Sequence, residues 1–278
     1  MKRLVSVFAL AGALAACNWF GDGGAGSGAD ASPTAAATAT AKASGGEAKS
    51  KSHGTGARSV AEETDDFLFE YAYPAEAGRI PELAAILDGR LDRQRAELTA
   101  EADQARRDAR QEGFPYNKHS YTAEWKVVTD LPRWLSLSLA VSTYGGGAHG
   151  NAGMESLVWD KERKRALDAK ALFASPAALY KAVEEKFCAA LDREREKRRG
   201  EPVDRSADDS FNKCPGIGEL TVLLGSSNRH TFNRLTLYAG PYVAGAYAEG
   251  DYEVDLSVDR AVLAVVKPEY REAFSARN

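Results

Sequence analysis

One histidine of the chain stands where its ring could act on a ligand. His149 lies in the stretch 144–153, in which five of ten residues are glycine, so few side chains can cover the imidazole. A catalytic base needs a nucleophile and an orienting acid within reach, and Ser142, Glu249 and Asp251 have suitable side chains. No Gly-x-Ser-x-Gly or His-Glu-x-x-His motif connects them. We therefore assign no catalytic residue and expect His149 to lock a hairpin by donating to backbone carbonyls. A hydrolase that uses His149 is the alternative.

Tyrosines and polar side chains near two loops are the candidates for ligand binding. They are Tyr144, His149 and Asn151 around the glycine-rich stretch, and Tyr242, Tyr247 and Glu249 nearer the C-terminus. A tyrosine combines an apolar ring with a polar hydroxyl, which suits a groove for a sugar or a peptide. The same aromatic spacing is more often that of a core or a sheet surface, and that alternative stays open.

Metal binding and phosphate binding have little support in the sequence. The four histidines His53, His119, His149 and His230 are far apart, and no cysteine set completes a zinc site around them. The run 145–147 of three glycines could cradle a phosphate, but no helix start follows it. We predict neither a metal nor a cofactor.

The first residues have the layout of a secretory signal. Lys2 and Arg3 precede an apolar run over 4–16, which is shorter than the roughly 20 residues that span a bilayer. The end of this run, Leu-Ala-Ala-Cys, resembles the bacterial lipobox. That resemblance implies cleavage after residue 16, a lipid on Cys17, and acyl chains that hold the protein on a membrane. The alternative is an ordinary signal peptide. Asn18 in place of an aspartate favours the outer membrane, on its periplasmic side, if the cell is Gram-negative.

Two further cysteines, Cys188 and Cys214, remain once Cys17 carries a lipid. Two thiols in an exported, oxidising compartment usually pair, so we predict a disulfide between them. On the chain-entropy account, a closed loop of this size stabilises the fold by about 3 kcal/mol. No Cys-x-x-Cys spacing supports the alternative of a redox-active pair.

Composition separates a tether from a folded part. The segment 17–64 contains Gly, Ala, Ser and Thr in long runs and has no Leu, Ile or Phe after Phe20, so we predict a disordered tether. The whole chain has 36 basic and 40 acidic residues and a formal net charge of −4, without the basic excess of a nucleic-acid-binding protein. We therefore expect no nucleic-acid partner.

The folded part alternates strand and helix patterns. Aromatic residues at every second position predict a strand over 67–73, and a leucine stripe from Pro81 predicts a helix to residue 112. A second helix begins after Ser175 and ends at Gly200. Further strands are expected around 121–127, 135–141, 155–160, 220–224, 235–239 and 252–257, and a short helix or turn at 260–266. These elements predict an α+β fold, with antiparallel sheets packed against two principal helices. We divide it into a smaller part, 65–118, and a main domain, 119–278.

Four motifs resemble a known extracytoplasmic domain. The stretch 142–151, Ser-Thr-Tyr-Gly-Gly-Gly-Ala-His-Gly-Asn, is followed by Trp159-Asp160 and by a segment from Leu167 to Phe173. Near the C-terminus stands 241–250, Pro-Tyr-Val-Ala-Gly-Ala-Tyr-Ala-Glu-Gly. This pattern is similar to the domain shared by the anti-sigma factor RsiV and the peptidoglycan deacetylase PdaC. The segment from 69 to the following helix resembles the smaller domain that usually precedes it.

The resemblance implies an anchored domain outside the membrane. In RsiV the domain recognises lysozyme, and in PdaC the deacetylase chemistry belongs to a separate catalytic domain that has no counterpart here. The transmembrane and sigma-binding segments of RsiV are also missing. We therefore expect an envelope lipoprotein that binds a protein or a cell-wall glycan, with lysozyme and peptidoglycan as candidate partners, and without catalysis of its own. A purely structural envelope protein is a third hypothesis.

Overall fold

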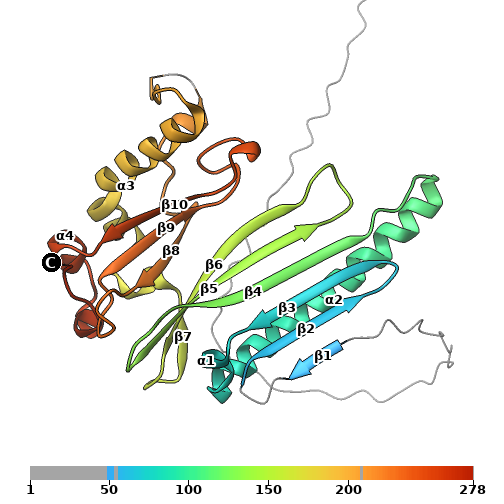
Figure 1. Cartoon of the computed structure of the whole chain (residues 1–278), viewed down its shortest axis with the longest axis horizontal. Coiled ribbons are helices and arrows are strands. Elements are labelled where there is room, and N and C mark those ends of the chain that lie inside the picture. The colour runs from blue at the N-terminus through green and yellow to red at the C-terminus, as the bar shows by residue number, and fades with distance from the viewer. Residues whose placement is uncertain (1–48, 53–55, 207–208, 278) are drawn as a thin grey trace, which may run out of the picture. The chain divides into compact units, whose positions relative to one another are not determined.

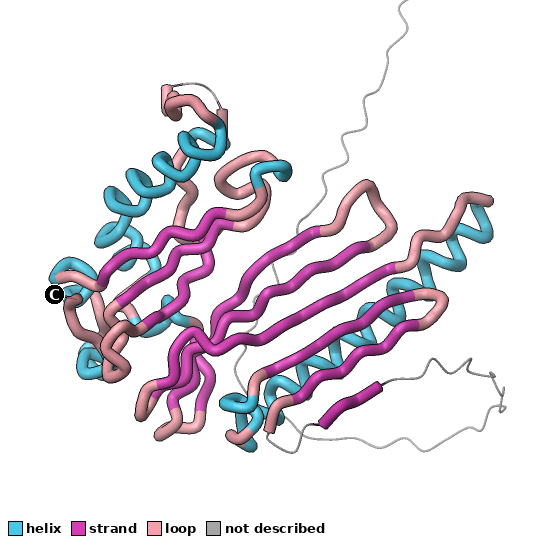
Figure 2. Tube along the Cα trace, in the orientation of Figure 1, coloured by secondary structure: helices cyan, strands magenta, loops and turns pink. Residues whose placement is uncertain are grey.

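Two β-sheets and two long helices make up the part of the chain that the computed structural model describes, residues 49–52, 56–206 and 209–277. Residues 44–278 form one compact unit. The predicted signal peptide, Cys17 and most of the predicted tether lie outside the described residues. The predicted α+β class is confirmed (Figures 1 and 2).

The larger sheet has seven strands that lie in chain order. They are β1 (Lys49–Ser52), β2 (Arg58–Glu63), β3 (Phe67–Tyr73), β4 (His119–Asp130), β5 (Trp134–Tyr144), β6 (Asn151–Asp160) and β7 (Arg165–Leu167). Strands β3 and β4 pair in parallel, and all other neighbours pair antiparallel. A parallel pair needs a crossover connection, which the long helix between β3 and β4 supplies. The sheet is therefore mixed, and the prediction of antiparallel pairing alone was wrong for this pair.

Strand β2 corrects the predicted end of the tether. Residues 58–63 pair with β3 along their whole length, and Val60 and Glu62 are buried. A strand at the side of an existing sheet forms backbone hydrogen bonds with its neighbour. Strand β2 therefore needs little apolar burial of its own to pair with β3. The low apolar content of residues 58–63 suggested disorder, because composition does not show whether a segment pairs with a neighbouring strand. The sheet also continues across the predicted boundary at residue 118, because Phe67 of β3 pairs with His119 of β4.

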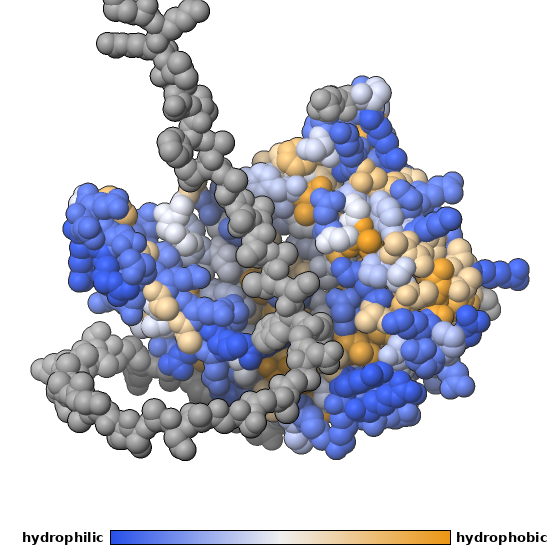
Figure 3. All heavy atoms as spheres, turned by 180° about the vertical axis from the view of Figure 1, so that it is seen from behind, coloured by the Kyte–Doolittle hydropathy of each residue, from blue (hydrophilic) through white to orange (hydrophobic). Residues whose placement is uncertain are grey.

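Helix α2 (Pro81–Glu112) lies against one face of the larger sheet, after the short helix α1 (Ala75–Gly78). Its bounds agree with the prediction, and it ends at Gly113 with φ of 77°, a left-handed conformation that glycine adopts without strain. Its buried residues are Leu83, Leu87, Leu91, Leu98, Ala102 and Ala109. The buried residues of the outer half, 97–112, are Leu98 and two alanines, and the rest of its surface is hydrophilic (Figure 3).

The smaller sheet has the order β10–β9–β8 and is antiparallel. Its strands are β8 (Leu220–Gly225), β9 (Arg234–Ala239) and β10 (Tyr252–Ser257). Helix α3 (Pro176–Arg199) packs against it and begins where the hydroxyl of Ser175 accepts from the backbone N–H of Ala178 at 3.0 Å. Short helices complete the fold: Ala169–Leu172, Ser210–Asn212, Tyr247–Glu249, α4 (Arg260–Ala264) and Pro268–Ala273.

The two sheets have separate cores that meet along β5 and β6. One core joins α2 to the larger sheet, and the other joins α3, α4 and the smaller sheet. Trp134 and Val158 of the larger sheet belong to the second core, and Thr221 of β8 donates its hydroxyl to the carbonyl of Met154 in β6 at 2.6 Å. Strand β8 is thereby held beside β6, and this docking brings the loops that follow β5 and β9 together.

Candidate functional site

Three aromatic rings from two loops meet at the surface. His149 lies in the loop between β5 and β6, and Tyr242 and Tyr247 lie in the connection between β9 and β10. The rings of His149 and Tyr247 are stacked with centroids 4.0 Å apart, and Tyr242 lies 6.1 Å from the histidine ring and 5.4 Å from Tyr247. We call these three side chains the aromatic cluster.

Hydrogen bonds within the aromatic cluster define the tautomer of His149. Its Nδ1 lies 2.9 Å from the carbonyl oxygen of Gly150, which can only accept, so Nδ1 carries the proton. In the neutral ring Nε2 is then an acceptor, and the hydroxyl of Tyr242 lies 3.2 Å from it. The hydroxyl of Tyr247 donates to the same Gly150 carbonyl at 2.9 Å. His149 thus makes a backbone contact of the predicted kind while it also joins the two loops.

The aromatic cluster is exposed rather than packed into the core. Tyr242 has 52 % of its surface exposed and Tyr247 36 %, which makes them two of the four large exposed hydrophobic residues among those described. Tyr242 also has φ of 66°, a left-handed conformation that is unfavourable for a bulky residue. Strain of this kind persists where the surrounding structure imposes it, and it is concentrated at functional positions.

Buried arginine contacts hold the tyrosine loop. Arg195 of α3 donates from Nε to the carbonyl of Ala244 at 2.8 Å and from Nη2 to the carbonyl of Lys213 at 2.9 Å. Arg199, one turn later, pairs with Glu249 at 3.0 Å. These contacts with α3 therefore hold the loop that contains Tyr242 and Tyr247.

Glu249 belongs to this support and not to the aromatic cluster. Its carboxylate accepts from Arg199, from the hydroxyl of Tyr252 and from the backbone N–H of Ala246. Burial raises the pKa of Glu249, but the hydrogen bonds from Tyr252 and Arg199 outweigh it and lower the pKa below its usual value. Gly245 permits the close approach, because a Cβ there would stand 2.5 Å from a Glu249 oxygen.

Tyr144 and Asn151 lie at the base of the glycine-rich loop. The hydroxyl of Tyr144 donates to the carbonyl of Gly147 at 2.9 Å and closes the loop on itself. Both residues line a hollow of about 330 Å³ beside α2, whose lining contains none of the three rings of the aromatic cluster. Of the predicted binding residues, the structure brings together His149, Tyr242 and Tyr247 and assigns other contacts to the rest.

No catalytic set forms around His149 within the described part of the chain. Ser142 lies on the open face of β5, and Asp251 bonds the hydroxyl of Tyr238. Glu249 pairs with Arg199. None of the three residues suggested as nucleophile or acid therefore contacts the imidazole. The contacts of the His149 ring are the Gly150 carbonyl and the two tyrosines.

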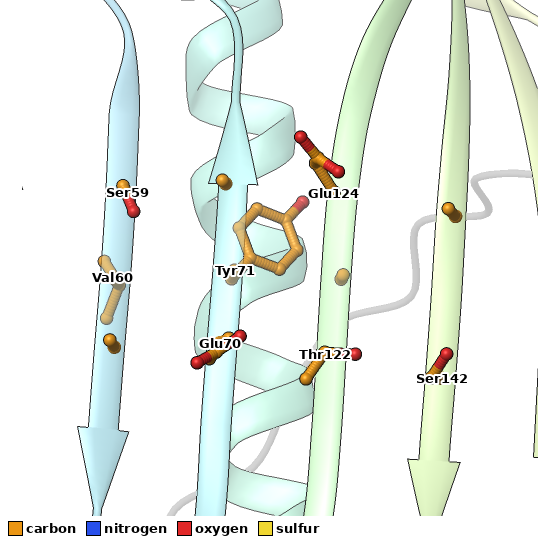
Figure 4. Close-up of a pocket in the computed structure, with 11 residues that line it drawn as sticks. Ser59, Val60, Glu70, Tyr71, Thr122, Glu124 and Ser142 are labelled. Atoms are coloured by element: carbon orange, nitrogen blue, oxygen red, sulfur yellow. The ribbon is translucent and has the colours of Figure 1, made fainter.

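A second hollow of about 490 Å³ lies on the face of the larger sheet opposite α2 (Figure 4). Strand alternation directs Tyr71 toward the helix and leaves small or polar side chains on the open side. Those labelled in Figure 4 are Ser59, Glu70, Thr122, Glu124 and Ser142. The lining contains hydroxyls and carboxylates but no histidine.

The described residues contain no group of three or more His, Cys, Asp or Glu side chains that could hold a metal. None of the helices described is long and apolar enough to cross a membrane. Cys188 and Cys214 form a disulfide, with Cα atoms 5.6 Å apart, and it fastens the segment before β8 to α3.

Comparisons with known proteins give a partial match. Residues 60–152, from β2 to the start of β6, match the family model described as deacetylase PdaC, so this segment is similar to that family. The sequence analysis placed the RsiV/PdaC-like domain at 119–278, whereas the match covers the N-terminal half of the folded part. It includes His149 but neither tyrosine of the aromatic cluster.

Solved structures that resemble the chain include two of the DUF3298 family. A DUF3298 family protein from Pseudomonas aeruginosa PAO1 has 18 % identity and a TM-score of 0.48, over 80 % of this chain and 97 % of that one. A DUF3298 family member from Bacteroides fragilis NCTC 9343 has 14 % identity and a TM-score of 0.46, over 76 % and 91 %. No curated protein sequence matches the chain.

The sequence analysis did not single out Arg195, although a signal was present. The buried positions of α3 follow Leu179, Val183, Phe187 and Leu191 at every fourth residue, and the next member of that series is Arg195. A charged residue on a core stripe needs a buried partner, so its position alone indicates a structural contact.

Proposed function

We propose that the chain is a membrane-anchored envelope protein whose folded part binds a protein or a cell-wall glycan through the aromatic cluster, without catalysis of its own. The observation that carries this proposal is the exposure of Tyr242 and Tyr247 beside a stacked histidine, on a loop that buried contacts hold in place.

The geometry suits a ligand with flat apolar faces and hydroxyl groups. Aromatic rings in a fixed orientation offer contact area at a small cost in conformational entropy, and tyrosine hydroxyls add polar contacts at the edge. Sugar rings and the side chains of a protein surface both have this chemistry. Peptidoglycan and lysozyme are therefore the partners to test first.

The anchor is the second part of the proposal. A lipid on Cys17 followed by a polar tether would place the folded part close to a membrane and leave it free to meet its ligand. Full-length protein with Cys17→Ser should lose metabolic labelling by palmitate and appear in the soluble fraction. Retained labelling in this variant would contradict attachment at Cys17.

Binding is tested with the purified full-length chain, by co-sedimentation with insoluble peptidoglycan and by capture on immobilised lysozyme. Tyr242→Ala and Tyr247→Ala should each weaken binding about five- to tenfold, since an aromatic contact contributes on the order of 1 kcal/mol. Phe114→Ala is the matched control, because Phe114 is 50 % exposed but lies beyond the end of α2.

The outcomes separate the hypotheses. Absence of binding to both materials at micromolar concentration rejects both named partners, and equal losses in the Phe114→Ala control reject the aromatic cluster as the site. Cleavage of peptidoglycan by the wild type that is lost in a folded His149→Ala variant would support the hydrolase instead.

A further inference from the structure

The two loops that form the aromatic cluster are uncharged. Residues 145–150 and 240–248 contain no Asp, Glu, Lys or Arg, although these types make up 27 % of the chain. The acidic residues that follow have other partners, because Glu249 pairs with Arg199 and Asp251 bonds the hydroxyl of Tyr238. Neither loop therefore offers an ionic contact, and a ligand here is bound through ring surfaces and neutral hydrogen bonds.

The three rings form one shallow surface and not a cage. Their planes are tilted by 25° to 37° to one another, and centroids 4.0 to 6.1 Å apart are those of rings in mutual contact. An aromatic cage for a cation surrounds its ligand with ring faces, and rings this close leave no space between them. The surface open to a ligand is the exposed outer side of Tyr242 and Tyr247.

Both tyrosine hydroxyls of the aromatic cluster already donate a hydrogen bond. The tautomer of His149 makes Nε2 an acceptor, so the hydroxyl of Tyr242 donates to it at 3.2 Å. The hydroxyl of Tyr247 donates to the carbonyl of Gly150 at 2.9 Å. A phenol has a single hydrogen to donate, so each of these oxygens can only accept a further bond. A ligand that bonds to them has to supply the donors.

The residues that flank the rings add little contact surface. The exposed neighbours on the same loops are Gly147, Ala148, Ala246 and Ala248, whose side chains are short or absent. A stable protein interface buries about 800 Å² on each partner and has a polar rim. Two exposed tyrosines among glycines and alanines match a small unit of a ligand better than they match a protein surface.

On the basis of the proposed function, we infer that the ligand of the aromatic cluster is a glycan, one uncharged pyranose unit of which lies on the tyrosines. The C–H face of the sugar packs against Tyr242 and the exposed side of Tyr247, and sugar hydroxyls donate to the two phenolic oxygens. A pyranose unit combines a flat apolar face with hydroxyl donors around its rim, and it needs no ionic partner.

The test is isothermal titration of the full-length chain with two uncharged oligosaccharides, cellotetraose and the N-acetylglucosamine tetramer of chitin. Saturable binding of either supports the inference, and binding of the chitin tetramer alone adds the acetamido group to the recognised unit. No saturable heat with either up to about 10 mM overturns it. In that case, capture on lysozyme or co-sedimentation with peptidoglycan leaves the proposed function standing, whereas failure of both rejects that function as well.

Variants link the binding to the two phenolic oxygens. Tyr242→Phe and Tyr247→Phe keep the rings and remove the acceptors, so each should weaken binding about fivefold, the effect of one neutral hydrogen bond. Tyr144→Phe is the matched control, because the hydroxyl of Tyr144 also donates to a glycine carbonyl of this loop at 2.9 Å but lies outside the aromatic cluster. Circular dichroism checks that each variant is folded. Unchanged affinity in both cluster variants, or an equal loss in the control, overturns the inference.

Discussion

The guanidinium of Arg195 donates to the carbonyl oxygen of Ala244 at 2.8 Å from a side chain that has no exposed surface. Burial lowers the pKa of Arg195 from its usual value, while the carboxylate of Asp192 opposes this shift. The arginine remains charged, because a guanidinium is not deprotonated in proteins. A buried cation thus fixes the loop that contains the exposed tyrosines.

Arg195→Met should destabilise the fold by about 3 kcal/mol or more, since it removes the guanidinium that donates to the carbonyls of Ala244 and Lys213. The change should be measured by urea unfolding followed by circular dichroism. Arg193→Met is the control, because Arg193 is exposed on the same helix. Equal midpoints for the two variants would show that the Ala244 contact contributes nothing to stability.

Loss of the disulfide should also destabilise the fold. It links residues 26 apart in sequence, and a loop of this length corresponds to about 3 kcal/mol on the chain-entropy account. The double variant Cys188→Ser with Cys214→Ser should unfold at a correspondingly lower urea concentration than the oxidised wild type. Wild type reduced by dithiothreitol should match the double variant, and a reduced protein as stable as the oxidised one would contradict the prediction.

Two glutamates should give pH effects of opposite sign. The pKa of Glu249 is lowered, because hydrogen bonds from Tyr252 and Arg199 outweigh burial, so its charge stabilises the fold above its ordinary pKa. That contribution is lost as the pH falls through the lowered value. Glu249→Gln should therefore be less stable than wild type at pH 7, and the difference should shrink toward pH 3.

Glu253 is the control for this pH effect. Burial, Asp251 and Asp255 raise its pKa, so its charged form opposes folding at neutral pH. Glu253→Gln should be more stable than wild type at pH 7, and the gain should vanish as acid protonates the wild-type side chain. Thermal unfolding at a series of pH values measures both variants, and differences of the same sign would refute the assignment.

The core of the larger sheet contains one polar contact whose loss should be measurable. The indole N–H of Trp125 donates to the hydroxyl of Tyr71 at 2.8 Å, and both side chains are buried. Tyr71→Phe leaves this donor without an acceptor and should cost about 1–3 kcal/mol. Tyr121→Phe on the neighbouring strand should cost less in the same urea experiment, because its hydroxyl has no hydrogen bond to a described residue.

Local patterns in the sequence determined the secondary structure of this protein. The leucine stripe and Pro81 placed α2 with its observed bounds, and the Ser175 cap and Gly200 placed α3, because helix periodicity and end signals act within a few residues. Strand alternation likewise located β3 and β10. The α+β class follows from these elements alone.

Pairing between distant segments was decided only in three dimensions. Strand β2 has one buried valine and is held by hydrogen bonds to β3, and the parallel pairing of β3 with β4 depends on how α2 packs. Neither depends on a pattern within the strand itself. The low apolar content of residues 58–63 therefore suggested a disordered tether, whereas these residues form a strand that pairs with β3.

The candidate site shows the same division. The sequence singled out His149, Tyr242, Tyr247 and Glu249 by residue type. His149 is 93 positions from Tyr242, and residue type does not show which side chains meet. The tertiary structure stacks His149 on Tyr247, because the docking of β8 beside β6 brings the two loops together. It places Glu249 against Arg199, because α3 packs beside the loop that contains this glutamate. Side-chain chemistry is encoded locally, whereas the site is created by contacts between elements far apart in the chain.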